Sequence, residues 1–191
     1  MSIAKPSGIP AKRADAERNR EKILAAARAA FADPDADPSM AEIARRAGIG
    51  SATLYRNFAN RRSLLEALYT YEVDALCEAA TTITGDSPGA ILITWMRRFY
   101  AYYTSKRHVA AELLEHTSAD NPVFGGGLPR VLAAGQPLLL AAQSAGEIRS
   151  DLTLKQILDL VVSVAKIQGS TEYVEPILRA ALDALRPTDQ A

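Results

Sequence analysis

Cysteine and histidine are scarce in this chain of 191 residues, which contains one cysteine and two histidines. The single thiol, Cys77, excludes a disulfide within the chain and is typical of a reducing compartment. His108 and His116 are eight positions apart, about two helical turns, so a metal shared between them is not expected. We therefore predict neither a metal site nor any other cofactor.

Long apolar runs and nucleotide-binding motifs are also missing. No apolar segment approaches the length of a membrane span, and residues 1–10 lack the apolar core of a secretory signal. The chain contains no phosphate loop of the G-x-x-x-x-G-K type, and its acidic residues follow no catalytic pattern. These absences predict a cytoplasmic protein that is not an enzyme and does not contact a membrane.

Net charge is zero, but the charges are unevenly distributed. Residues 1–62 contain 12 Lys and Arg against 7 Asp and Glu, whereas residues 63–191 contain 10 against 15. A basic N-terminal part on an acidic body is the asymmetry expected when one end of a protein faces phosphate. Chance clustering is the alternative interpretation.

The segment 39–65 predicts two short helices joined by a glycine turn. Ser39 followed by Glu42 has the spacing of a capping box, in which each side chain satisfies a backbone N–H of the first helix. Gly48 suits the positive φ that often ends a helix, and Ser51 is a candidate cap for the second helix. The order helix, glycine turn, helix is typical of a helix-turn-helix.

The second short helix of this segment has two distinct faces. Leu54 and Phe58 are four positions apart and are predicted to lie together on the buried face. A helix of about two turns fits the major groove of DNA. A structural hairpin with an ordinary polar surface is the alternative. The opposite face carries Ala52, Thr53 and Arg56.

The run I-A-x-x-A-G-I-G-x-x-T-L-Y-x-x-F-x-N-R, which begins at Ile43, resembles the DNA-binding signature of the TetR family of one-component bacterial regulators. The resemblance implies an all-α fold, in which a three-helix helix-turn-helix unit is joined by a long helix to a helical domain for ligand binding and dimerisation. It implies the DNA-binding domain over 15–66 and the regulatory domain over 67–191. Residues 1–14 contain prolines, a glycine and cationic residues, which predict a disordered basic arm.

The same resemblance implies the DNA contacts. The family places a backbone-contacting Thr and Tyr at the positions of Thr53 and Tyr55, and a Lys where Arg61 stands. The helix N-terminus, Ser51 and Ala52, is expected to meet base edges. The full set of expected DNA contacts is Ser39, Ser51, Ala52, Thr53, Tyr55, Arg56, Asn57 and Arg61.

The rest of the chain is predicted to be helical, with a break at residues 85–89, which read G-D-S-P-G. Apolar periodicity and capping residues place helices at 60–82, 90–106, 107–116, 128–144, 153–168 and 171–185. The helix over 60–82 is the expected connection between the two domains. The last two helices are apolar on most sides, so a second subunit is expected to cover part of them. The resemblance implies a dimeric four-helix bundle, with an interface at Ile157, Val161, Val164, Ile177, Leu178 and Leu182.

The helix over 90–106 is rich in large aromatic residues, which line either an effector pocket or the protein core. The candidate pocket residues are Trp95, Phe99, Tyr100, Tyr103, Leu113 and Leu132. Three functions stay open. The first is a repressor that binds a palindromic DNA operator as a homodimer and is released by an unknown, mostly apolar small molecule. The second is a DNA-binding regulator of the same fold without an effector, and the third is an all-helical enzyme or interaction module.

Overall fold

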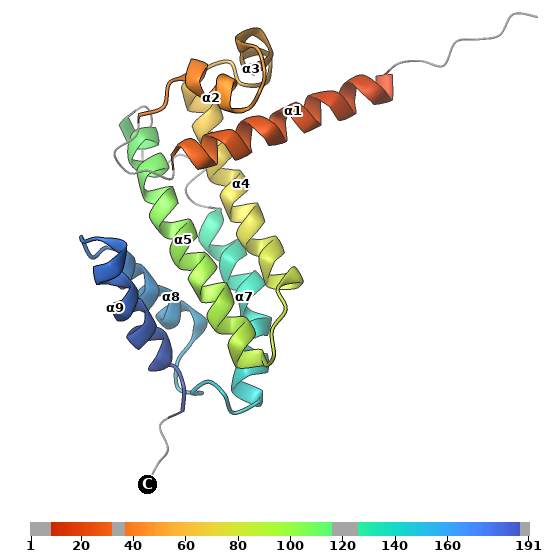
Figure 1. Cartoon of the computed structure of the whole chain (residues 1–191). Coiled ribbons are helices and arrows are strands. Elements are labelled where there is room, and N and C mark those ends of the chain that lie inside the picture. The colour runs from red at the N-terminus through yellow and green to blue at the C-terminus, as the bar shows by residue number, and fades with distance from the viewer. Residues whose placement is uncertain (1–8, 32–36, 116–125, 188–191) are drawn as a thin grey trace, which may run out of the picture. The chain divides into compact units, whose positions relative to one another are not determined.

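The computed structural model describes residues 9–31, 37–115 and 126–187, without the side chains of 9–13, 106–108 and 111–115. Within these ranges every regular element is a helix (Figure 1), as the all-α prediction requires. The helices are α1 (Ile9–Ala30), α2 (Met40–Arg46), α3 (Ser51–Asn57), α4 (Arg61–Thr82), α5 (Pro88–Glu115), α7 (Gly127–Ser144), α8 (Leu154–Ala165) and α9 (Thr171–Asp183).

The chain forms two compact units, Met1–Leu68 and Tyr69–Ala191. The helix α4 begins in the first unit and continues without interruption into the second. The first unit therefore consists of α1, α2, α3 and the first two turns of α4, and the second unit contains the remaining helices.

A small apolar core holds the first unit together. Helices α1, α2 and α3 pack against one another in all three pairs. Phe31, Ile43, Leu54 and Phe58 are all buried at the centre of this core, which confirms the predicted buried face of Leu54 and Phe58. Leu64, on the first turns of α4, is also fully buried. The core therefore fixes the position of α3 against α1 and α2.

Helix α1 begins at Ile9, so residues 9–14 belong to a helix and not to the expected disordered arm. Pro10 occupies the first turn, where the missing N–H of proline costs no hydrogen bond. Ala11, Lys12 and Arg13 then continue the helix, and all three residue types have high helix propensity. Residues 1–8 of the expected arm lie outside the described residues.

The second unit is built around Trp95 on α5. Its indole N–H donates to the carbonyl oxygen of Leu76 on α4 at 3.1 Å, and its ring is fully buried. Helix α7 approaches so closely that a Cβ on Gly135 would lie 2.4 Å from Cη2 of Trp95. The predicted helices 90–106 and 107–116 are one helix, α5, because no glycine or proline separates them.

Helices α8 and α9 are the last two helices of the second unit, and each follows a residue whose side chain caps its N-terminus. Thr153 forms a complete capping box with Gln156 at the start of α8, which confirms Thr153 as the predicted cap. Ser170 caps α9 by accepting from the backbone N–H of Tyr173. The apolar faces of both helices turn toward the core that contains Trp95.

Candidate nucleic-acid interface

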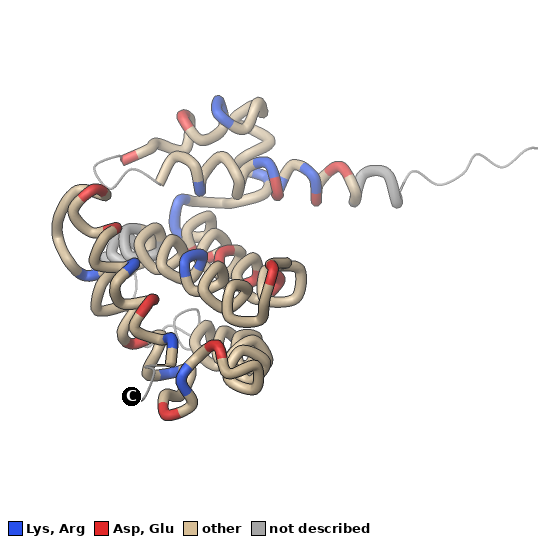
Figure 2. Tube along the Cα trace, turned by 60° about the horizontal axis from the view of Figure 1, so that its bottom comes forward, with Lys and Arg blue, Asp and Glu red and all other residues tan. Residues whose placement is uncertain are grey.

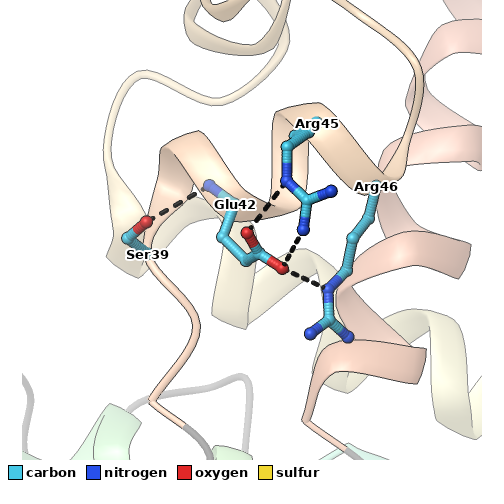
Figure 3. A network of polar contacts seen from close by, with 4 residues as sticks. All are labelled: Ser39, Glu42, Arg45 and Arg46. Carbon is cyan, nitrogen blue, oxygen red and sulfur yellow. Dashed lines mark hydrogen bonds and ion pairs between the residues drawn. The ribbon is translucent and has the colours of Figure 1, made fainter.

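The predicted cap of α2 is present. Ser39 has an extended backbone, and its hydroxyl oxygen accepts from the backbone N–H of Glu42 at 3.2 Å. The reciprocal half of the predicted capping box is replaced, because the carboxylate of Glu42 turns along the helix to Arg45 and Arg46 (Figure 3). Carboxylates bind guanidinium groups more strongly than they bind neutral N–H groups, which accounts for the difference.

The Glu42 carboxylate accepts from both arginines at once. Nε and Nη2 of Arg45 bind its two oxygens at 3.1 and 2.8 Å, and Nε of Arg46 binds at 2.8 Å (Figure 3). The hydrogen bond from Arg45, followed by that from Arg46, lowers the pKa of Glu42 below its usual value. The network therefore holds two cationic groups on the outer face of α2. A Glu followed by Arg at i+3 and i+4 is the sequence signal that would have identified it.

The turn between α2 and α3 depends on Gly48, whose φ of 67° confirms the predicted left-handed conformation. The N–H of Ile49 donates to Ala44 and that of Gly48 donates to Arg45, the two bonds of a Schellman motif. The predicted cap of α3 was wrong by one residue. Gly50 occupies the cap position without a side-chain bond, and Ser51 is the first residue of the helix.

Helix α3 presents a polar face to solvent and an apolar face to the core. Leu54 is fully buried on the inner side. On the outer side Tyr55 is 52% exposed, which is unusual for so large an apolar ring. Ser51, Ala52 and Arg56 are also exposed. Four of the eight expected DNA contacts thus form one continuous surface on α3.

Two other expected DNA contacts on α3 form hydrogen bonds within the helix itself. The side-chain amide of Asn57 donates to the backbone carbonyl of Thr53 at 2.8 Å, and the hydroxyl of Thr53 accepts from Arg56 at 3.0 Å. Both Thr53 and Asn57 are half-buried. These bonds fix the side chains beside Tyr55 before any partner binds.

The eighth expected contact, Arg61, is turned toward the protein. Its guanidinium donates to the carbonyl of Pro38 and to the carboxylate of Asp37, and it lies over the ring of Phe31. Asn60, the first residue of the helix predicted over 60–82, caps the same end of α4, because its side-chain oxygen accepts from the N–H of Ser63 at 2.9 Å.

Charge on the first unit is mixed and not uniformly basic. Figure 2 shows Lys and Arg interspersed with Asp and Glu along α1.

No cluster of metal-ligating side chains occurs in the part of the chain that the structure describes. None of the described helices is long and apolar enough to cross a membrane. The exposed polar groups on α3 are the hydroxyl of Ser51, the phenol of Tyr55 and the guanidinium of Arg56.

Two family models match the chain. Residues 23–68 match bacterial regulatory proteins of the tetR family, and residues 87–187 match the C-terminal domain of SbtR-like transcriptional regulators. The second match alone spans more than half of the chain. The chain belongs to the TetR family. It is therefore a transcriptional regulator with a helix-turn-helix DNA-binding domain, as the resemblance of its sequence implies, and not an enzyme.

Solved structures agree with this assignment to the TetR family. The TetR transcriptional regulator SCO0520 from Streptomyces coelicolor is 36% identical with a TM-score of 0.76, over 88% of this chain and 99% of that one. A TetR regulator from Mycobacterium vanbaalenii is 32% identical with a TM-score of 0.73, over 92% and 99%. The ketosteroid transcriptional regulator KstR2 of Mycobacterium tuberculosis, at 20% identity and a TM-score of 0.52 over 88% and 95%, shares the fold. No curated protein matches the chain.

The expectation that this chain lacks the serine-hydrolase pattern G-x-S-x-G was wrong at the level of the letters, because they occur at residues 85–89. Here Ser87 precedes a helix without a strand before it, and its hydroxyl accepts from the N–H of Ala90 at 3.3 Å. A Cβ on Gly89 would lie 2.5 Å from a carboxylate oxygen of Glu147. The pattern is therefore explained by a helix cap and a close contact.

The expected effector and interface residues of this TetR-family regulator lie mostly in its core. Trp95 and Phe99 are buried and stacked with their ring centroids 6.5 Å apart. Tyr100, Tyr103 and Leu132 are half-buried, and the side chain of Leu113 lies outside the described residues. A cavity of about 540 Å³ lies elsewhere, between the end of α7 and residue 187.

The expected dimer-interface residues are mostly covered within the single chain. Those that are buried are Ile157, Val161, Val164, Leu178 and Leu182, and Ile177 is half-buried.

Proposed function

We propose that this TetR-family regulator is a repressor that binds a palindromic operator as a homodimer and is released by a small, mostly apolar effector. The observation that carries the DNA-binding part is the outer face of α3, where Tyr55 and three further expected contacts are exposed. The buried Leu54 and the Gly48 turn hold this face outward. A helix so supported can enter the major groove with its N-terminus toward the bases.

A dimer follows from the size of the recognition helix. With seven residues, α3 offers too few contacts for tight binding by one copy, and two-fold proteins match palindromic half-sites about 34–36 Å apart. TetR-family regulators act as dimers, and the exposed apolar residues of α8, of α9 and of the loop between them supply a candidate surface. These are Leu160 and Ile167, each 37% exposed, and Tyr173.

Release by an effector requires that the effector bind the DNA-incompetent conformer more tightly. Moving the population from 99:1 to 1:99 takes about 5.5 kcal/mol of differential affinity, which two sites in a dimer would share. Because α4 is continuous through both units, a change in its tilt is the proposed route from the effector to α3.

The burial of Trp95 and Phe99 favours the second candidate, a regulator of the same fold without a small-molecule effector. In that case the aromatic residues of α5 serve packing alone. Titration of lipophilic compounds separates the two candidates, because Trp95 is the single tryptophan and its fluorescence reports on this region. A compound that releases DNA supports the first candidate.

Selection from a random pool of DNA duplexes with the full-length protein tests the proposal. We expect enrichment of a two-fold symmetric sequence, protected by one dimer in footprinting. Light scattering should show a dimer for the wild type and a monomer for Leu160→Asp, because a charge at the centre of an apolar interface is costly. A monomeric wild type, or the enrichment of no sequence, would contradict the proposal.

A further inference from the structure

Arg61 differs from the other arginines of the DNA-binding unit in being largely covered by protein. Its side chain is 23% exposed, whereas those of Arg45 and Arg46 are 74% and 43% exposed. It is the first residue of α4, directly after the capping residue Asn60. A cationic residue in this place is expected to reach for phosphate, but the structure shows it holding other parts of its own unit.

Three contacts of the Arg61 guanidinium are formed with described residues. Nη1 donates to the carbonyl of Pro38, and Nη2 donates to a carboxylate oxygen of Asp37 at 2.7 Å. Cζ lies 5.3 Å from the centroid of the Phe31 ring, within the range of a cation–π interaction. Phe31 directly follows α1, and Pro38 directly precedes the cap of α2. One side chain thus joins the start of α4 to the end of α1 and to the entrance of α2.

The chemistry of arginine suits this junction. A planar guanidinium can donate to two acceptors in fixed directions while its face lies on an aromatic ring, which a lysine ammonium cannot do. The joined segments determine where α2 begins, and α3 packs on both α1 and α2. The orientation of the recognition helix relative to the first turn of α4 therefore depends on this contact.

We propose that Arg61 is a positioning residue for DNA binding, which acts through Phe31, Asp37 and Pro38 and does not bind phosphate. This inference rests on the DNA-binding function proposed above. It also identifies the place at which a movement of α4 would reach α2 and α3.

Salt dependence distinguishes positioning from phosphate binding. Each lost phosphate contact reduces the slope of log affinity against log salt by about 0.9, or about 1.8 for a symmetric dimer. For Arg61→Gln, measured by fluorescence anisotropy with a labelled duplex of the selected operator, we expect about a tenfold loss of affinity and an unchanged slope. Unchanged affinity, or a slope reduced by about 1.8, would overturn the proposal.

Arg56→Gln is the matched control, because Arg56 is exposed on α3 and is an expected phosphate contact. It should lower the slope that Arg61→Gln leaves intact. Arg61→Lys adds a second test, because it keeps the charge but loses the planar fork. We expect Arg61→Lys to lose as much affinity as Arg61→Gln, and wild-type binding by Arg61→Lys would contradict positioning.

A double-mutant cycle with Asp37→Asn tests the ion pair itself. Removal of one negative charge has a general effect on DNA binding that is seen in both backgrounds, and this effect is subtracted first. After the subtraction we expect Asp37→Asn to weaken operator binding in the wild type and to have no further effect in Arg61→Gln. If Arg61 bound phosphate, Asp37→Asn would release the guanidinium and strengthen binding in the wild type alone. Arg61→Lys and the single variant Asp37→Asn still decide the question if thermal melting shows that Arg61→Gln unfolds the unit.

Failure of this inference is distinguishable from failure of the proposed function. If the wild type binds no duplex, both the proposed function and this inference are wrong. A wild type that binds its selected operator, together with a reduced slope in Arg61→Gln, removes the positioning role alone.

Discussion

Tyr55 and Trp95 show how differently the two compact units use a large aromatic side chain. Tyr55 is 52% exposed on a two-turn helix, whereas Trp95 is fully buried and donates its indole N–H to a backbone carbonyl. Aromatic residues cost little to bury and much to leave in water. An exposed aromatic at a fixed place in a motif therefore indicates recognition, and aromatic residues spread along a long helix indicate packing.

The two units also differ in what lies against their aromatic rings. In the first unit a guanidinium covers each of two rings, with Arg20 over Phe58 at 4.6 Å and Arg61 over Phe31 at 5.3 Å. In the second unit Phe99 lies against other rings, including Trp95. A unit as small as the first cannot surround every ring with apolar atoms, so arginines complete its core at the rim.

The largest expected effect distinguishes core from interface in the second unit. Val161 is fully buried in the single chain, so Val161→Asp should destabilise the subunit by about 4 kcal/mol or more through an uncompensated buried charge. This differs from the simple loss of dimerisation that an interface position predicts. Thermal unfolding followed by circular dichroism measures the effect.

The neighbouring residue Leu160 supplies the control, because it is partly exposed on the same helix. Leu160→Asp should leave the subunit folded and should lower the unfolding temperature less than Val161→Asp does, because it removes only the contribution of the dimer. A folded, monomeric Val161→Asp would mean that Val161 belongs to an interface and that the contrast between the two positions is wrong.

A smaller effect is expected where α7 approaches α5. Gly135→Ala should destabilise the second unit by about 1–3 kcal/mol, because the added Cβ would lie 2.4 Å from Cη2 of the buried Trp95. Gly126→Ala is the matched control, since nothing lies within 4 Å of a Cβ at that position. Chemical denaturation followed by Trp95 fluorescence reports both variants, and equal midpoints would show that the α5–α7 contact can relax.

The sequence was most informative where local rules decide the structure. Gly48, the Ser39 cap and the Thr153 cap follow from backbone geometry within a few residues, and all three were predicted correctly. The buried positions of α3 follow from helical periodicity. In the same way the family was predictable, because its signature lies in one continuous segment.

Features that depend on distant residues were not predictable in this way. The inward turn of Arg61 requires Asp37 and Pro38, which are 24 and 23 residues away in the chain. For α8 and α9, periodicity predicts an apolar face but does not say whether the same chain or a second copy covers it. The expected interface residue Val161 therefore lies in the core, and the aromatic residues of α5 could not be divided into pocket and packing.

A more modest effect is expected on the recognition face. Tyr55→Phe removes one exposed hydroxyl, which should weaken operator binding by about 1 kcal/mol per subunit and leave folding intact. Tyr71→Phe, at a half-buried tyrosine of α4 in the second unit, is the matched control and should change DNA affinity little. Anisotropy titrations with the selected operator measure both. Equal affinities for the two variants would remove Tyr55 from the set of DNA contacts.

The smallest effect is expected for the surface network on α2. The hydrogen bonds from Arg45 and Arg46 lower the pKa of Glu42 below its ordinary value of 4.5, so the ionised carboxylate favours the folded state. This stabilisation is complete above pH 4.5 and is lost as the pH falls through the lowered pKa of the folded protein. Glu42→Gln should therefore lower the unfolding temperature slightly at neutral pH and not at all in strong acid.

The variant Arg45→Gln with Arg46→Gln isolates the cause of this pH dependence. Without the two guanidinium groups the pKa of Glu42 has no reason to be lowered, so adding Glu42→Gln to that background should change the unfolding temperature equally at every pH. A pH-dependent difference that survives in the background without the arginines would mean that another group titrates. The exposed network on α2 would then not contribute to stability through its ion pairs, in agreement with the small contribution of most surface salt bridges.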